Sequence, residues 1–453
     1  MRGMLLLALL VLASCSGAAD DSTARQHSIT APTPTPEGGT QPTATMPSSF
    51  YASGWPAVHH DGANSDTAPV PASDRFARVF HSLDGFRTIA IPAVANGSVY
   101  LTVVDLNGSD CHLAAIDAAN GDLRWCSEAI NGTAFGSTPV IDHRGNLYVG
   151  DDTKMVSLDS AGAPRWRTPI DGLPLSAQLT GDGRLLFTTH IGTVYVLDRE
   201  TGAELASLEL VPGLTYDGNW GDLLTCPQGS TTGACPSANT PAVDPVAGRV
   251  FITLNRPGEA DGTLVALQYQ GGDDPRLEPL WDNRALAGGG AGSPTISADG
   301  RRVYTTDRDQ HLIAFDAFTG QVIWTHPLGY NAGGSPSVND QGVIVPSGGR
   351  NPAYLTAVRD GGDHATTLWE HRDVAHRGLA VQPDGDVVYA ALVSGGIVNL
   401  AVVDLATGDT RSLTSTETGA WASMGTAIGP DGSVYLTTPL NGIYGFRPDP
   451  PPP

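Results

Sequence analysis

Residues 313–324 read IAFDAFTGQVIW, and this stretch decides the fold. A run of strand-forming residues ends at Asp316, a Thr-Gly pair follows, and a second such run carries Trp324 four residues after Gly320. Glycine supplies the positive φ of a tight hairpin, and the Asp and Thr side chains can satisfy the backbone groups of the turn. The stretch therefore predicts two neighbouring antiparallel strands with a large aromatic ring on the second.

This hairpin recurs along the chain. Residues 113–125 and 158–166 keep the Gly-to-Trp spacing, and the copies that start at Asp198 and Asp404 keep the Thr-Gly turn without the aromatic residue. Trp281 and Trp369 end two less regular copies. We expect these tryptophans to wedge between neighbouring repeats, where each indole N–H finds a partner.

A second type of turn gives the period of the repeat. It ends in glycine, precedes a short β-branched or aromatic strand, and occurs at Gly97, Gly145, Gly183, Gly248, Gly300, Gly342, Gly385 and Gly432. The mean interval is about 48 residues, the length of a four-stranded propeller blade with its loops. Upstream of these turns lie runs of small residues, as at 137–140, 292–295 and 334–337, which suit an innermost strand beside the axis.

The last repeat, residues 425–446, has three strand-like runs, while the alternating run 75–83 is left over near the other end. Pairing the two would remove an exposed sheet edge. We therefore predict an all-β fold, an eight-bladed β-propeller of four-stranded antiparallel blades over residues 51–447, closed by an N-terminal strand. A Pro-rich tail is expected at residues 448–453.

The N-terminal residues predict export. Arg2 precedes an apolar run of about ten residues, which is long enough for a signal peptide and too short to span a bilayer. The run ends in Leu-Ala-Ser-Cys at Cys15, a pattern similar to the bacterial lipobox, so we expect a signal peptide at 1–14 and lipidation of Cys15. The alternative is an ordinary cleavage nearby, with Cys15 incidental. Residues 15–50, rich in Ser, Thr and Pro, are expected to tether the body to the outer face of the cell membrane.

Composition excludes several function classes. Forty-seven acidic and 25 basic residues give a net charge of −22, and an acidic surface repels nucleic acid. The five cysteines form no Cys-x-x-Cys motif, and no nucleophile elbow, zinc-protease motif or phosphate-binding loop occurs.

Four cysteines suit an oxidising exterior. Cys111 and Cys126 flank a predicted hairpin and are expected to form a disulfide, and so are Cys226 and Cys235, which lie in a long insertion at about residues 211–238. A loop held in one shape could present an aromatic docking surface, for which Tyr216, Asp217 and Trp220 are the candidates. The alternative is a loop that only caps its blade.

The D-x-x-T-G-x-x-x-W repeat resembles that of the PQQ-type propellers, the quinoprotein dehydrogenases and their non-enzymatic relatives. The opening segment, with Trp55-Pro56 and His59-His60-Asp61-Gly62, is similar too. The resemblance implies a quinone held beside adjacent cysteines, with calcium on the axis, in the enzymes. This chain has no adjacent cysteines and no Cys-x-x-Cys-His, so we expect no cofactor and place it with the non-enzymatic relatives.

A few polar positions could serve a ligand or a metal. Gln178, Asn239, Arg377 and Ser423 are the polar exceptions on the predicted inner strands, and either an axial ligand or a water-filled channel explains them. His59-His60-Asp61 suggests a metal site, but a loop packed under the closing strand explains it better. Asp307 with Asp309, and Asp273 with Asp274, lack the ligand pattern of a calcium loop and are expected to be solvated.

The sequence thus favours a membrane-anchored exported lipoprotein, expected to be monomeric, whose propeller is a binding or assembly scaffold for an envelope protein or polymer. The alternative is a divergent PQQ-dependent quinoprotein dehydrogenase that uses PQQ with calcium to oxidise an alcohol or sugar.

Overall fold

The computed structural model describes residues 50–88, 90–131, 137–216, 237–290, 292–349 and 353–450, all within one compact unit, Pro42–Pro453. Throughout these ranges the regular elements are strands, and none of the described residues forms a helix. A membrane-spanning helix is accordingly not found in the described part of the chain.

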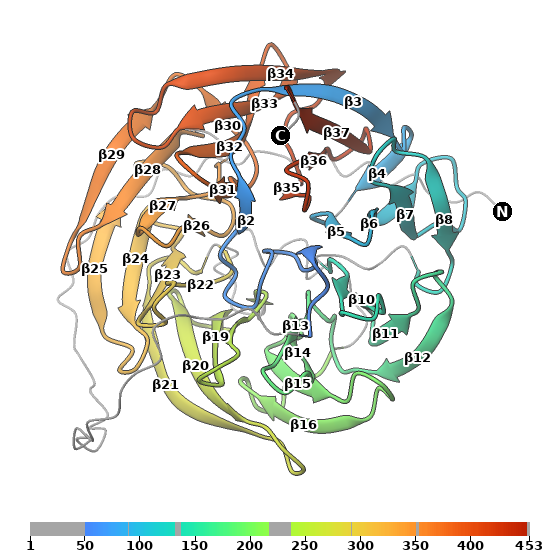
Figure 1. Ribbon diagram of the computed structural model, residues 1–453. Helices are drawn as coiled ribbons and strands as arrows, with labels where there is room; N and C mark the ends of the chain where they lie inside the picture. The colour runs from blue at the N-terminus through green and yellow to red at the C-terminus, as the bar shows by residue number, and fades with distance from the viewer. Residues whose placement is uncertain are drawn as a thin grey trace. The chain divides into compact units, whose positions relative to one another are not determined.

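Eight antiparallel sheets of four main strands surround a central axis like the blades of a propeller (Figure 1). The predicted fold class is confirmed. Listed from the axis outward, blade 1 contains β5 (Ala93–Ala95), β6 (Ser98–Asp105), β7 (Leu113–Asp117) and β8 (Leu123–Ser127); blade 2, β9 (Val140–Ile141), β10 (Leu147–Asp151), β11 (Lys154–Leu158) and β12 (Pro164–Pro169); blade 3, β13 (Gln178–Leu179), β14 (Leu185–Thr188), β15 (Thr193–Leu197) and β16 (Glu204–Glu209); and blade 4, β18 (Ala242–Asp244), β19 (Arg249–Asn255), β20 (Gly262–Gln270) and β21 (Arg276–Leu286).

The second half of the ring repeats this order. Blade 5 contains β22 (Thr295–Ile296), β23 (Arg302–Thr306), β24 (His311–Asp316) and β25 (Val322–Pro327); blade 6, β26 (Ser337–Val338), β27 (Val343–Val345), β28 (Leu355–Asp360) and β29 (Ala365–His371); blade 7, β30 (Ala375–His376), β32 (Val387–Ser394), β33 (Ile397–Asp404) and β34 (Thr410–Gly419); and blade 8, β35 (Gly425–Ile428), β36 (Val434–Thr437), β37 (Ile443–Pro448) and β3 (Phe76–Ser82). The short strands β1 (Gly54–Trp55), β2 (Thr67–Pro71), β4 (Phe86–Thr88), β17 (Ser237–Ala238) and β31 (Gln382–Asp384) add to these sheets or pair beside them.

The hairpin chemistry expected from the sequence is present in the turn from β24 to β25. Asp316 Oδ1 accepts hydrogen bonds from the backbone N–H groups of Phe318 and Thr319 and from the Thr319 hydroxyl. Gly320 has a φ of +70°. One carboxylate therefore organises the turn, and glycine takes the conformation that other residues rarely adopt.

Tryptophans of the outermost strands pack against neighbouring blades, as expected, but the buried indole N–H of Trp281 has no hydrogen-bond partner among the described residues. Trp166 of blade 2 donates its indole N–H to the Arg199 carbonyl oxygen of blade 3, and Trp369 of blade 6 donates to the Leu405 carbonyl oxygen of blade 7. The same rings cover the turn glycines of the next blade: a Cβ added at Gly202 would lie 2.6 Å from Trp166. The Gly-to-Trp pattern therefore records contacts between blades as well as the turn within one blade.

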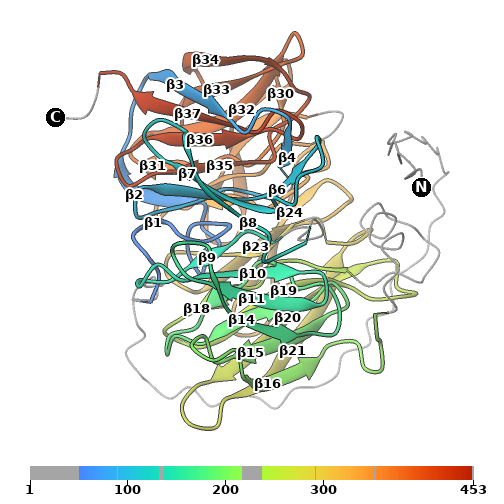
Figure 2. The same ribbon diagram turned by 90° about the vertical axis from the view of Figure 1, so that its right-hand side faces the viewer.

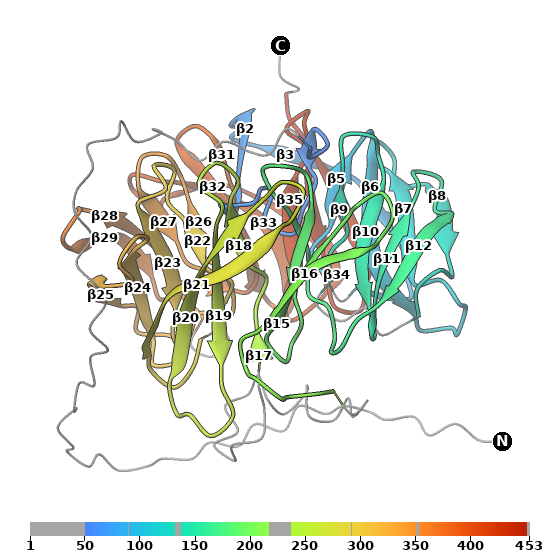
Figure 3. The same cartoon turned by 90° about the horizontal axis from the view of Figure 1, so that it is seen from below.

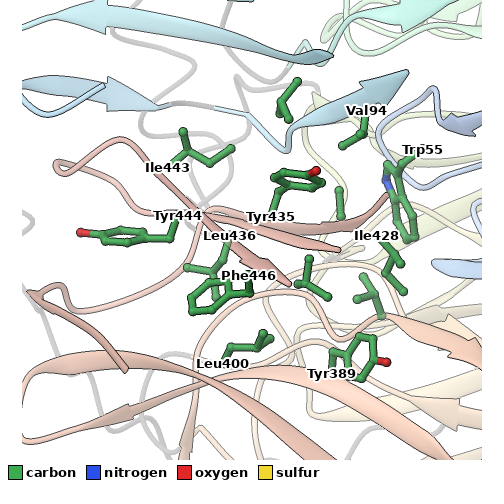
Figure 4. Packing of buried hydrophobic residues seen from close by; sticks show 14 of the residues in the cluster. Trp55, Val94, Tyr389, Leu400, Ile428, Tyr435, Leu436, Ile443, Tyr444 and Phe446 are labelled. Atoms are coloured by element: carbon green, nitrogen blue, oxygen red, sulfur yellow. The ribbon is translucent and has the colours of Figure 1, made fainter. Parts of the chain in front are cut away.

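The ring closes through β3. This strand pairs antiparallel with β37, from Phe76 opposite Pro448 to Ser82 opposite Ile443, so the closure predicted from residues 75–83 is confirmed. Pro448, the first residue of the expected tail, is still part of β37. Buried side chains of β35–β37 fill the space between blades 7 and 1 (Figure 4).

Residues 50–72 form a feature that the sequence did not predict, and we call this segment the strap. It runs across the inner ends of the blades, where β1 pairs with β5 and β2 pairs in parallel with β31 (Figure 1). The expectation that the 59–62 loop packs under the closing strand is wrong. His59 instead contacts Ser335 beside β26, because the strap follows the inner strand edges from blade to blade.

Candidate functional site

The centre of the ring is the candidate site, because propeller ligands bind on the axis and the sequence placed its candidate residues there. The strap supplies backbone carbonyl oxygens to the inner strands of successive blades. Ile141 N–H donates to Pro56 O at 2.9 Å, Ile296 N–H to Ala63 O at 2.9 Å, Val338 N–H to Ser65 O at 2.9 Å and Gln382 N–H to Asp66 O at 3.0 Å. The N–H groups on these inner edges are therefore satisfied by the chain itself.

Gln178 belongs to this arrangement. Its amide nitrogen donates to Asn64 Oδ1 at 2.7 Å, and its oxygen accepts from the Tyr51 hydroxyl at 2.5 Å. Asn64 in turn donates to the carbonyl oxygens of Pro241 and Pro294 in blades 4 and 5. Burial raises the pKa of Tyr51 above its ordinary value, so the hydroxyl stays a donor. Gln178 thus holds the strap, and its side chain is fully buried.

A buried polar series fixes the turn of the strap to blade 6. Asp66 Oδ2 lies 2.9 Å from His59 Nδ1, and His59 Nε2 lies 3.2 Å from Ser335 Oγ. Burial raises the pKa of Asp66, and the neighbouring imidazole opposes that rise. The order of groups is that of a serine-hydrolase triad, but Ser335 is 3% exposed and its Oγ also accepts the Ser293 N–H. We therefore interpret the series as a structural link.

The other three candidates lie at the opposite ends of the inner strands. Asn239 donates to Thr253 Oγ1 at 2.9 Å, and the buried Ser423 hydroxyl bonds within its own turn to Gly425. Ser423 N–H donates to the Arg377 carbonyl oxygen, so the structure brings these two together through the backbone while Gln178 lies with the strap. An axial ligand set formed by all four residues is therefore not assembled.

The enzymes that share this fold imply a quinone and a calcium ion, so we ask whether the described residues include side chains that could bind them. Within the described ranges no group of three His, Cys, Asp or Glu side chains could hold a metal ion. The two strap carboxylates are already engaged: Asp61 accepts from the Ser65 hydroxyl at 2.7 Å, and Asp66 binds His59. Burial opposes ionisation of Asp61, but hydrogen bonds from His60 and Ser65 outweigh it and lower its pKa. The described residues therefore do not fit calcium-bound quinone on the axis.

One expectation about carboxylates is wrong. Asp307 is buried instead of solvated, because it accepts the backbone N–H of His311 at 2.8 Å and lies 3.0 Å from the His311 ring. Asp309, Asp273 and Asp274 are exposed, as expected.

A cleft of about 240 Å³ lies between blades 5 and 6. Its principal charged group, Asp360, accepts from the Tyr304 hydroxyl at 2.6 Å and from the Trp324 indole at 3.1 Å, and Arg302 lies 3.3 Å away. Burial, followed by the Asp360 hydrogen bond, raises the pKa of Tyr304. Asp360 thus connects blades 5 and 6, and both of its carboxylate oxygens already accept hydrogen bonds.

The predicted disulfide between Cys111 and Cys126 is present, with 5.5 Å between the Cα atoms, and it ties the start of β7 to the end of β8. Tyr216 is half-buried and meets the His190 ring edge-on at 4.9 Å. Cys15, Cys226, Cys235, Asp217 and Trp220 lie outside the described residues, so their predicted roles stay predictions.

Comparison with known proteins decides the family. A family model described as outer membrane protein assembly factor BamB matches residues 81–180, 109–275 and 260–424. The chain belongs to this PQQ-like propeller family. Protein Rv3035 of Mycobacterium tuberculosis is 32% identical to this BamB-family chain over 406 residues, which are 88% of this chain and 96% of that protein.

Solved structures share the fold of the BamB family. BamB from Moraxella catarrhalis superposes with a TM-score of 0.56 at 18% identity, covering 82% of this chain and 99% of that one. Quinohemoprotein alcohol dehydrogenase from Comamonas testosteroni gives a TM-score of 0.62 at 15% identity, covering 87% and 80%. BamB and the dehydrogenase therefore share this fold, and the fold alone does not decide between their functions.

Proposed function

We propose that this chain is an exported, lipid-anchored scaffold of the cell envelope whose propeller binds an envelope protein. The observation that carries the proposal is the strap, which occupies the inner strand edges with the chain's own backbone and engages Gln178, Asp61 and Asp66. Because the strap engages these inner strand edges, we expect partners to bind the loops and rims of the propeller.

The family supports the same function. Its model carries the name of an outer membrane protein assembly factor, and this chain matches it over most of the propeller. Anchoring through Cys15 is proposed from the sequence, which places the cysteine directly after a short apolar run. Cofactor-free binding is part of the proposal, and it is supported by the lack, among the described residues, of a group of three His, Cys, Asp or Glu side chains that could hold a metal ion.

Fractionation of the native host tests the anchor. The wild-type chain is expected in the membrane pellet, and Cys15→Ser in the soluble exported fraction. Equal distribution of the two proteins would contradict lipidation at Cys15.

Cross-linking in living cells tests the scaffold. The full chain is expected to yield the same envelope protein in repeated experiments, identified by mass spectrometry. The quinoprotein alternative rests on the fold, and reduction of a dye after addition of PQQ, calcium and an alcohol would support it instead.

A further inference from the structure

The two faces of the propeller differ in how they are covered. We call the face that carries the strap the strap face: Phe50 O accepts from His143 N–H in a turn of blade 2, and Ala72 N–H donates to Asp384 O in a turn of blade 7. The opposite face, here called the distal face, is formed, as far as the described residues go, by the connections from the second to the third strand of a blade and by those between blades (Figure 3). A partner that binds over the inner strand ends without displacing the strap must therefore use the distal face.

Exposed large apolar side chains mark one sector of the distal face. Leu106 in the β6–β7 connection, Trp421 in the β34–β35 connection and Leu440 in the β36–β37 connection are 55%, 52% and 52% exposed. The remaining exposed large apolar residues of the described chain lie on outermost strands or in strap-face turns: Val79, Val246, Leu123, Leu280, Phe318, Val322 and Leu413. Among the described residues of the distal face, such side chains are therefore confined to the loops between blade 7 and blade 1.

Hydrogen bonds join these three loops into one surface. Asn441 Nδ2 donates to Gly419 O at 2.7 Å, which links the Leu440 loop to the Trp421 loop. Gly442 N–H donates to Phe86 O, and Leu106 N–H donates to Gly85 O at 3.0 Å, so the segment before β4 connects Leu440 to Leu106. Figure 2 shows β4 and β6 beside blade 8. We call Leu106, Trp421 and Leu440 the apolar patch.

The loops beneath the patch are held in place. β4 pairs with β6, and the Thr88 hydroxyl donates to Thr438 O at 2.7 Å across the boundary between blades 8 and 1. A preorganised surface loses little conformational entropy on binding, and tryptophan is enriched among the residues that contribute most to binding at protein interfaces.

The charges around the patch indicate the chemistry of the partner. Asp84 and Asp110 are exposed, Asp105 is half-exposed, and Arg87 is the exposed base in these loops. Glu417 nearby is neutralised by Arg78 at 2.5 Å. Acidic rims repel anionic membrane surfaces and also repel the same patch on a second copy of this chain, which itself carries a charge of −22.

We propose that the apolar patch docks a protein segment whose apolar side chains are flanked by lysine or arginine. This inference rests on the proposed scaffold function and adds the face, the residues and the partner chemistry. The apolar side chains would cover Trp421, Leu440 and Leu106, and the flanking bases would meet Asp84 and Asp110.

A matched pair of peptides tests the proposal. The full chain is titrated with a synthetic leucine–lysine peptide and with its leucine–glutamate counterpart. Because the chain has eight tryptophans, the fluorescence change of Trp421 is taken as the difference between wild type and Trp421→Phe. We expect the lysine peptide to bind and the glutamate peptide not to bind. Leu440→Ser is expected to weaken binding by about tenfold. Leu413→Ser, a change of an equally exposed leucine outside the patch, should leave binding unchanged.

Three outcomes would overturn the proposal: equal binding of both peptides, equal affinity of Leu440→Ser and wild type, or binding to anionic vesicles in place of the peptide. Self-association that Leu440→Ser abolishes would assign the patch to a second copy and would also overturn it. In cells, wild type and a Trp421→Ala/Leu440→Ser variant could both recover the same cross-linked partner. That result would overturn the role of the apolar patch and would still support the scaffold function.

Discussion

The side chain of Gly320 is a single hydrogen atom, and this small size allows blades 4 and 5 to pack together there. This residue has a φ of +70°, and a Cβ added there would lie 2.5 Å from the Trp281 ring of the preceding blade. The Thr-Gly pair therefore serves the turn and the contact between blades together, and the sequence pattern recognised the first role directly.

We expect Gly320→Ala to lower the free energy of unfolding more than Gly258→Ala. Gly258 has a φ of +77° with nothing within 4 Å of an added Cβ, so its substitution reports backbone strain alone, about 1 kcal/mol. Gly320→Ala carries the same strain and about 2 kcal/mol more, because the indole must move in a packed interface. Urea denaturation of both variants measures the difference, and equal losses would show that the indole moves freely.

His376 makes stability depend on pH. The side chain is fully buried in β30, and this burial lowers its pKa to about 4, against the opposing effect of the Tyr354 backbone. The unfolded chain takes up a proton near pH 6.5, and the folded chain does so only near pH 4. Stability from this residue is therefore full above pH 6.5 and is lost as the pH falls towards 4.

Between pH 7 and pH 4.5 we expect His376→Leu to lose about 2 kcal/mol less stability than wild type. Denaturant titrations at the two pH values measure this. His190, whose pKa burial also lowers to about 4, remains in both proteins and cancels in the comparison. Parallel pH profiles of wild type and variant would contradict the assignment to His376.

At the scale of elements, the strap acts through side chains as well as through its backbone. Asn64 and Gln178 lie 2.7 Å apart, and each has further partners, Pro241 and Pro294 for one and Tyr51 for the other. Removal of either side chain leaves buried polar groups of the other without a partner.

We expect a double-mutant cycle of Asn64→Ala and Gln178→Ala to give a coupling energy of about 1 to 2 kcal/mol. Asn239→Ala serves as the control, because Asn239 bonds Thr253 and should add independently to Asn64→Ala. Thermal or urea denaturation of the variants gives the values. Additivity of the Asn64 and Gln178 substitutions would show that the strap is held by its backbone alone.

The strap marks the limit of what the sequence could predict for elements. The blades were predictable because glycine turns and alternating strands repeat about every 48 residues. The strap pairs mainly through backbone carbonyl oxygens, such as those of Pro56, Ala63 and Ser65, and such pairing leaves no apolar period. Gln178 was recognised as an unusual inner residue, but its partner Asn64, 114 positions away, gave no sequence signal.

At the scale of the whole molecule, two N-terminal segments hold the ring: the strap at the inner ends and β3 at the outer edge of blade 8. The position of β3 was predictable, because the last repeat, residues 425–446, lacked a fourth strand and the run 75–83 belonged to no repeat. Phe80 of β3 packs closely against blade 1: a Cβ added at Gly121 would lie 2.5 Å from the Phe80 ring.

Deletion of residues 1–82 is therefore expected to expose the β37 edge and to produce aggregated protein in size-exclusion chromatography. Deletion of residues 1–49 keeps the strap and β3, and this variant should elute as a monomer with an unchanged melting temperature. A soluble monomer from the longer deletion would show that the ring closes without β3.

The pairing of β3 with β37 also has a consequence for biosynthesis. Phe76–Ser82 is translated long before its partner strand, Ile443–Pro448, and must wait for it. Contacts so far apart along the chain form late. A chain that stops before Ile443 lacks the partner strand of Phe76–Ser82 and leaves Phe80 exposed, so we expect proteases to degrade it. Closure of the ring thereby requires that translation has passed Pro448.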